Sequence, residues 1–150
     1  MAVYNIVTVP DPILRQKAPK VEKINAGVLR VMDNMRDTMY AADGVGLAAP
    51  QIGVSKRIIV IDPGDQLIEM INPQIIYSEG EQTAREGCLS VPDLVGWCKR
   101  AQRITVRGLN RNGEEIEMEA TDMLARVFQH EIDHLDGIVF PDKAIQTKKI

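Results

Sequence analysis

The sequence predicts a single domain of the α+β class that spans residues 1–150, and three observations favour it. Two stretches, 25–42 and 122–135, repeat apolar residues at the three- and four-residue steps of an amphipathic helix. The runs between them are short, and they are either β-branched or alternating in polarity, as in strands. A chain of 150 residues is long enough for one core, and no repeat or linker divides it.

The composition argues against several classes of function. Hydrophobic residues make up 45% and charged residues 26%, as in a soluble globular protein. The net charge is −3 and the sequence has no basic stripe, so we expect no direct DNA binding. No apolar run approaches the roughly 18 residues of a membrane span, and the N-terminal stretch does not resemble a signal peptide. With two cysteines, these features favour a cytoplasmic protein with free thiols or metal-bound cysteine.

The N-terminal part of the chain is expected to hold one short strand and one helix. Residues 3–9 alternate weakly and are β-branched, which predicts an edge strand, and 13–15 predict a helical turn. The helix at 25–42 has Asn25 as its expected N-cap and Gly44 at the left-handed position after its end. Its Met-rich stripe fits core packing better than a flexible binding surface.

Runs typical of strands follow, at 57–62, 67–71, 74–77, 102–109 and 115–119. The first is β-branched and favours a central position in a sheet. Asn72-Pro73 predicts a bend between the second and the third, and turn residues at 110–113 predict a hairpin between the last two. The tail, 141–150, is short and polar, and we expect little structure there.

Small uncharged residues dominate the stretch 44–53. Gly44 and Gly46 would let another backbone approach closely, although a tight buried turn explains the stretch equally well. The glycines do not open a helix after a strand, so a nucleotide-binding loop is not indicated. Gln51 is a lone amide among apolar neighbours, and a buried amide needs hydrogen-bond partners.

The predicted helix at 122–135 carries His130, Glu131 and His134 in the pattern H-E-x-x-H. Residues four apart lie on one helix face, so two imidazoles can bind one metal ion while the glutamate acts as a base. A polar helix face without metal is the alternative. These are the only two histidines of the chain. Thr121 is the expected N-cap and Gly137 the expected left-handed residue at the end.

Two histidines need at least one further protein ligand, and the chain offers Cys88 and Cys98. Either could instead be a small buried apolar residue. We favour Cys88, because Gly87 before it lets the chain approach a metal closely.

Three segments together resemble the peptide deformylase family: GVGLAAPQ at 44–51, EGCLS at 86–90 and QHEIDHLDG at 129–137. Their order and spacing match as well, so the resemblance covers essentially the whole chain. It implies an α+β domain in which small antiparallel or mixed sheets pack around a central metal-binding helix. It also implies removal of the formyl group from the N-terminal formylmethionine of nascent polypeptides, with release of formate.

The resemblance further implies a site. Cys88, His130 and His134 would bind one divalent metal, usually Fe²⁺, with Zn²⁺, Ni²⁺ or Co²⁺ as substitutes. A metal-bound hydroxide would attack the formyl carbon, and Glu131 would act as general base and then general acid. The Gln51 side chain and the Leu89 backbone N–H would stabilise the oxyanion.

The substrate contacts that the resemblance implies come from two places. The backbone of Gly44 to Gly46 would pair with an extended peptide, and the methionine slot would be lined by Val45, Val127 and the stem of Arg126. Glu86 and Arg100 are expected to form an ion pair near the cysteine segment.

The chain also departs from the family. It ends before the extra C-terminal helix of longer members, which puts in doubt any docking on the ribosome through such a helix. Val95 replaces a basic residue that many members have. Two other readings of the H-E-x-x-H pattern stay open: a metallopeptidase, and a metal-stabilised binding module in which Cys98 fills the fourth position.

Overall fold

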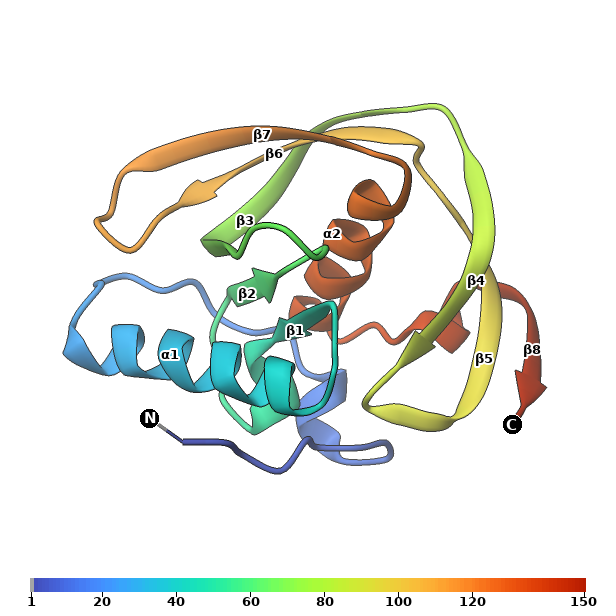
Figure 1. Ribbon diagram of the computed structural model, residues 1–150, viewed down its shortest axis with the longest axis horizontal. Helices are drawn as coiled ribbons and strands as arrows, with labels where there is room; N and C mark the ends of the chain where they lie inside the picture. The colour runs from blue at the N-terminus through green and yellow to red at the C-terminus, as the bar shows by residue number, and fades with distance from the viewer. Residues whose placement is uncertain (1) are drawn as a thin grey trace.

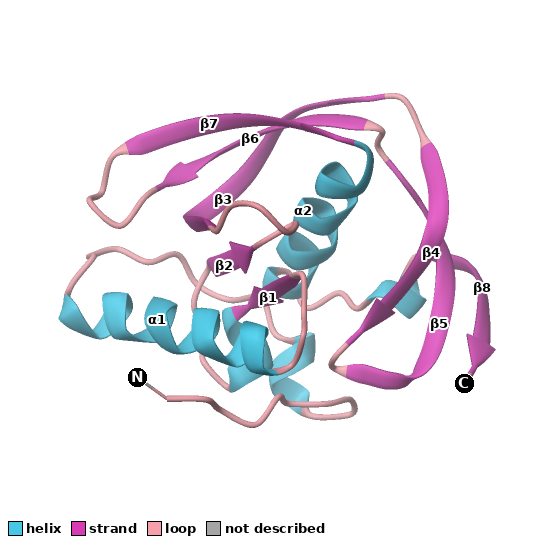
Figure 2. Cartoon of the chain, in the orientation of Figure 1, coloured by secondary structure: helices cyan, strands magenta, loops and turns pink. Residues whose placement is uncertain are grey.

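The computed structural model describes residues 2–150, and it arranges them as two antiparallel sheets with a helix between them (Figure 1). The first sheet has five strands in the order β1-β2-β3-β6-β7, and the second has three in the order β4-β5-β8. Helix α2 (Asp122–Leu135) lies between the sheets, and α1 (Ala26–Ala41) covers the outer side of the first (Figure 2). The α+β class and the central helix are confirmed.

The strands are β1 (Gly46–Ala48), β2 (Ile58–Ile61), β3 (Ile68–Glu79), β4 (Gln82–Cys88), β5 (Val91–Arg100), β6 (Arg103–Leu109), β7 (Glu115–Thr121) and β8 (Ala144–Lys149). Short 3-10 turns lie at η1 (Pro12–Arg15), η2 (Ala49–Ile52) and η3 (Phe140–Asp142). The predicted helical turn at 13–15 therefore lies within η1.

Helix α1 forms where its apolar period predicts it. The Asn25 side chain accepts a hydrogen bond from the Val28 N–H at 3.0 Å, as an N-cap does. The methionine stripe is fully buried, which confirms its role in the core. The prediction that Gly44 adopts the left-handed conformation is wrong by one position, because it is Asp43 that has a positive φ of 53°. The Gly44 N–H then donates to the Met39 carbonyl at 2.9 Å, the long bond of a Schellman ending.

Strand β2 is buried on both faces because a helix covers each side of the sheet. Ile58 and Val60 face the cluster around α1, whereas Ile59 and Ile61 face the cluster around α2. This explains why the run lacks polar alternation. As predicted, β2 lies inside the sheet, with β1 on one side and the middle strand β3 on the other.

The bent pair of strands is one strand, β3, with an irregularity at Asn72. Asn72 has φ 54°, and the register shifts between Ile71 and Gln74. The Asn72 side chain accepts a hydrogen bond from the Val21 N–H and donates one to the Val21 carbonyl, both at 2.9 Å. These hydrogen bonds compensate for the interrupted pairing of the strand. The predicted hairpin forms from β6 and β7.

Two further expectations are wrong. Residues 3–9 are not a strand, since they make only scattered backbone bonds, such as Val7 N–H to the Gln51 carbonyl at 2.7 Å. The polar tail is not unstructured, because residues 144–149 pair with β5 as β8.

No helix among residues 2–150 is long and apolar enough to cross a membrane.

Candidate metal centre and active-site pocket

Helix α2 presents His130 and His134 toward β4 of the second sheet and Glu131 toward β1 of the first. Its other side packs into the core through Ala125, Phe128 and Leu135, all fully buried, which fixes the rotation of the helix. Thr121 occupies the N-cap position, although its side chain makes no capping hydrogen bond. Gly137 has φ 77°, as predicted for the residue after the helix end.

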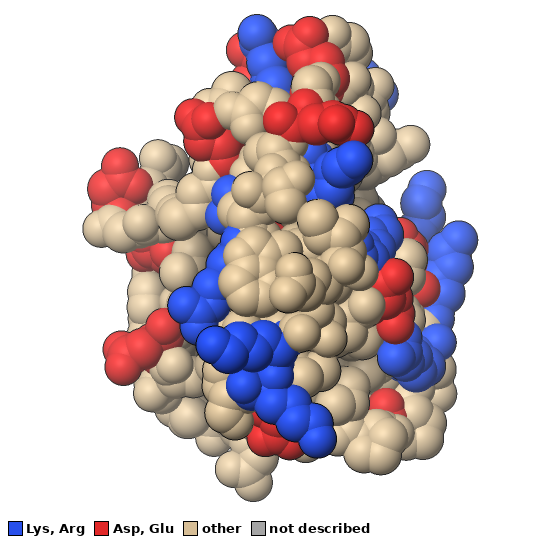
Figure 3. Space-filling view, turned by 90° about the vertical axis from the view of Figure 1, so that its right-hand side faces the viewer, with Lys and Arg blue, Asp and Glu red and all other residues tan. Residues whose placement is uncertain are grey.

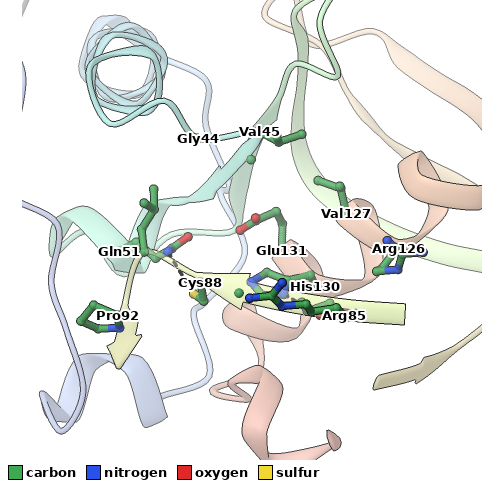
Figure 4. Close-up of a pocket in the computed structure, with 14 residues that line it drawn as sticks. Gly44, Val45, Gln51, Arg85, Cys88, Pro92, Arg126, Val127, His130 and Glu131 are labelled. Atoms are coloured by element: carbon green, nitrogen blue, oxygen red, sulfur yellow. Dashed lines mark hydrogen bonds and ion pairs between the residues drawn. The ribbon is translucent and has the colours of Figure 1, made fainter. Parts of the chain in front are cut away.

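Strand β4 brings Cys88 to the two histidines. One donor atom from each of Cys88, His130 and His134 lies within 4.8 Å of the others. Cys88 Sγ is 3.3 Å from His134 Nε2, and the two imidazole centres are 5.0 Å apart. Figure 4 shows Cys88 and His130 on the floor of a pocket, with Glu131 above them.

The donor set fits a divalent metal ion. Metal bonds of about 2.0–2.3 Å in a tetrahedron place ligand atoms roughly 3.3–3.8 Å apart, so the Cys88–His134 separation is already suitable. Three protein donors leave a fourth position for water or substrate, as in catalytic centres. Cys98 lies apart from this set. It is fully buried, its Sγ points to the Phe140 carbonyl at 3.6 Å, and burial raises the pKa of its thiol to about 11.

A buried network orients His130. Its Nδ1 lies 2.9 Å from Glu86 Oε1, which leaves Nε2 for a metal. The predicted ion pair of Glu86 with Arg100 is present, with bonds of 2.8 and 2.9 Å. Burial alone would raise the pKa of Glu86, but the hydrogen bonds from Arg100 and His130 outweigh it and lower the pKa to about 2. Arg100 also donates to Asp133 at 2.7 Å, a contact that the sequence did not indicate.

The two histidines have different electrostatic surroundings. Burial lowers the pKa of His134 to about 3, which keeps the ring neutral and its lone pair free. Burial also favours a neutral His130, but the neighbouring Cys88 and Glu86 outweigh it and raise its pKa to about 10. The acceptor groups around His130 thus favour positive charge at this position.

Glu131 is 4% exposed, and its Oε1 has no hydrogen-bond partner among residues 2–150. Burial raises its pKa to about 7. A Cβ atom added at Gly46 would lie 2.7 Å from Glu131 Oε2. The close approach that the glycine-rich stretch permits is therefore between β1 and this carboxylate.

Gln51 finds the partners that a buried amide requires. Its Oε1 accepts from the Ala48 N–H at 2.9 Å, and its Nε2 donates to Ser90 Oγ at 3.1 Å. The same Nε2 lies 3.8 Å from Cys88 Sγ, so the amide points into the metal centre.

The pocket above the centre has a volume of about 580 Å³. It is bordered by β1 and β4, one edge strand from each sheet, and by α2. The lining contains every residue suggested from the sequence for substrate or oxyanion contacts: Gly44, Val45, Gly46, Gln51, Leu89, Arg126 and Val127. It also contains Arg85 and Pro92, which sequence reasoning did not single out. Val95 is buried, pairs with Lys148 and does not line the pocket.

Comparison with known proteins agrees with this geometry. A sequence model of the polypeptide deformylase family matches residues 3–150. The peptide deformylase of Syntrophomonas wolfei is 64% identical over 148 residues, covering 99% of this chain and 97% of that one. The peptide deformylase of Carboxydothermus hydrogenoformans is 58% identical over 144 residues, with 96% and 95% covered.

Solved structures show the same arrangement of elements. The crystal structure of peptide deformylase from Thermotoga maritima superposes with a TM-score of 0.93 at 41% identity, covering 96% of this chain and 99% of that one. Sequence and fold agree along nearly the whole length, and this chain belongs to the peptide deformylase family.

Proposed function

We propose that the Cys88–His130–His134 centre and Glu131 carry out the hydrolysis by which this enzyme removes the formyl group from the N-terminus of nascent peptides and releases formate. One observation carries the proposal: three metal-donor atoms lie together under a buried carboxylate whose Oε1 has no protein partner in the described chain. When bound, a divalent ion supplies Lewis-acid activation of water and of the formyl carbonyl.

Glu131 moves the proton. Its Oε1 is free to accept a proton from the attacking water and then to give it to the departing amine nitrogen. A carboxyl group with a pKa of about 7 can take up and release protons at neutral pH, which both steps require. Gly46 leaves room for this side chain and keeps it over the centre.

The oxyanion is stabilised by donors that are fixed before the reaction. The Gln51 amide is held by Ala48 and Ser90, so its Nε2 needs little reorganisation when negative charge develops. The Leu89 backbone N–H is the second donor, from the turn that follows β4.

The peptide binds along the pocket in an extended form. The edge strand β1, with Gly44 and Val45 before it, offers backbone groups for pairing, and the methionine side chain lies against Val127 and the stem of Arg126. The proposed ion is Fe²⁺, as the family resemblance implies, although a Cys–His–His set also accepts Zn²⁺, Ni²⁺ or Co²⁺. Action on nascent peptides supports a location in the cytoplasm, close to the ribosome. The proposed catalytic domain comprises residues 1–150.

The Glu131→Gln variant tests the proton-transfer role, because it keeps the volume of the side chain and removes its basicity. Metal content should match that of the wild type, while formate release from a formyl-Met peptide should fall by about 10²–10⁴-fold. The protein is prepared anaerobically with Fe²⁺, and metal and formate are measured on the same sample. Normal turnover by this variant would disprove the role.

The cysteines provide a matched pair for the metal site. Cys88→Ser should lose the metal, whereas Cys98→Ser should retain it, because only the Cys88 sulfur lies with the histidines. Equal loss in both variants would favour the binding module with four protein ligands. Cleavage of an unformylated peptide without formate release would favour a metallopeptidase instead.

A further inference from the structure

We propose that Arg85 makes this enzyme favour formylated peptides with an acidic side chain at the second residue. The inference rests on the proposed function, since it concerns the peptide that occupies the same pocket. It deepens that function by naming a charge class of substrate.

Arg85 is the uncommitted charge on the rim of the pocket. The lining holds two carboxylates, Glu86 and Glu131, and both are buried. Arg126 lines the pocket as well, but its Nη2 donates to Gln82 Oε1. Arg85 is exposed and makes no side-chain hydrogen bond or ion pair within residues 2–150. A ligand carboxylate would therefore not compete with a protein partner for this guanidinium.

Successive side chains of strand β4 point to opposite faces of the sheet, so Arg85 lies on the face opposite to the metal ligands. Glu86 and Cys88 face inward, where they contact His130 and His134. Arg85 lies between such positions in the pleat and is paired with Trp97 on the outer face of the sheet. β4 is an edge strand, so an extended peptide can lie alongside it. Its side chains would then alternate between the same two faces.

The direction of the peptide follows from the methionine slot. Figure 4 shows Arg85, Arg126 and Val127 on one side of Cys88, and Pro92 on the other. With the formyl group at the metal centre and the methionine side chain against Val127, the chain runs toward Arg85. The first side chain points inward, so the second points to the outer face that Arg85 shares.

The distances allow a direct contact. The second Cα of an extended peptide lies about 6 Å beyond the formyl carbon. Arg85 is three residues from Cys88, which is at most about 10 Å along the strand, because the register is irregular between Glu86 and Cys88. The remaining offset is roughly 4 Å along the strand and about 4.8 Å across it, and arginine and glutamate side chains together span this gap.

Other cations on the same face add to the attraction. The register places Lys99 opposite Thr83 and Lys148 opposite Val95, on the outer face with Arg85 and Trp97. Figure 3 shows lysine and arginine side chains around the centre of this side of the molecule, with aspartate and glutamate side chains among them. A positive potential at the pocket rim attracts anionic peptides and repels cationic ones.

The test compares peptides of the form formyl-Met-X-Ser in which X is Glu, Gln or Lys. With metal-loaded wild-type enzyme, we expect kcat/KM to rank Glu, Gln, Lys, with steps of about 2–5-fold, as for an exposed ion pair. The differences should lie in KM and should shrink at high salt. Arg85→Ala should remove the ranking, and Arg85→Glu should reverse it.

Lys99→Glu is the matched control, because it changes the same charge on the same face but does not line the pocket. It should keep the ranking. A reversal by Lys99→Glu as large as that by Arg85→Glu, or a ranking that appears only when the charge is moved to the third residue, would overturn the assignment. Equal rates for all three peptides would also overturn the role of Arg85. If none of the three peptides released formate, the proposed function itself would be refuted.

Discussion

Two arginine networks in this chain each contain a short ion pair but differ in their surroundings. Arg100 donates to Glu86 and Asp133 at 2.7–2.9 Å, and its side chain is 2% exposed. Arg103, on the outer hairpin, contacts Glu119 at 2.6 Å with 47% of its side chain exposed. Water screens the second network and is excluded from the first. Removing one partner is therefore costly only where the remaining charge stays buried.

The difference matters for function because only the buried network reaches the metal centre. Glu86 links Arg100 to His130 and so fixes the imidazole that is proposed to bind the metal. Asp133 ties the same arginine to α2 itself, between the two histidines. The exposed network joins β6 to its neighbours β3 and β7, at the outer surface of the first sheet.

The largest expected effect is that of Arg100→Met, which keeps much of the side-chain volume and removes the only cationic arginine or lysine partner of the buried Glu86 within residues 2–150, while Asp133 keeps its ion pair with Lys143. We expect a loss of about 3–5 kcal/mol in the free energy of unfolding. Metal affinity should fall as well, because Glu86 no longer holds His130 in place. Urea unfolding and metal titration measure the two effects. A variant as stable as the wild type would show that burial does not determine the strength of this network.

Acid should weaken the buried network in a defined range. Glu86 has a folded pKa of about 2, below its ordinary value of 4.5. A lowered pKa contributes stability that is complete above about pH 4.5 and is lost as the pH falls toward 2. The pH-dependent part amounts to about 3 kcal/mol. The stability difference between wild type and Glu86→Gln, measured in a chelator to remove metal effects, should shrink over this range. A constant difference would contradict the lowered pKa.

The buried side of α2 also leaves no room for extra atoms. In Gly46→Ala, the new methyl group would lie 2.7 Å from Glu131 Oε2 and 3.0 Å from Val127 Cγ1. We expect Glu131 to move and kcat to fall by roughly 10²-fold, because a displacement of about 1 Å at a catalytic group has that effect. Val127→Ala in the same chain should not restore kcat, since the carboxylate contact persists. Full recovery would mean that crowding of Val127 was the cause.

The regions that are best predicted from the sequence are those in which one buried face makes apolar residues recur at regular steps. Helix α2 begins and ends at the predicted residues because its apolar face repeats at helical steps and Gly137 ends it. The β6–β7 hairpin follows from its alternation and turn residues. Strand β8 leaves no such pattern, since its residues are mostly exposed and only its backbone pairs with β5.

The side chains of the site could be predicted from the sequence, but the hydrogen bonds and ion pairs that connect them could not. Composition restricted the histidine ligands to His130 and His134, and the glycine before Cys88 favoured that cysteine. Asp133 lies between the histidines in the sequence, yet its partner Arg100 is 33 residues away. Arg85 has no signal of its own, because its role depends on which strand edge borders the pocket. Such contacts follow from how the two sheets close around α2.

The smallest effect is expected for Arg103→Met, the counterpart of Arg100→Met on the exposed hairpin. Its two ion pairs, to Glu119 at 2.6 Å and Glu79 at 3.7 Å, are open to water, so the loss should be about 0–1 kcal/mol. A double-mutant cycle with Glu119→Gln separates the pair from other effects of either substitution. High salt should reduce even this coupling, whereas the buried Arg100 network should respond much less. A coupling energy at Arg103 as large as at Arg100 would show that bond length, not burial, sets the strength of both networks.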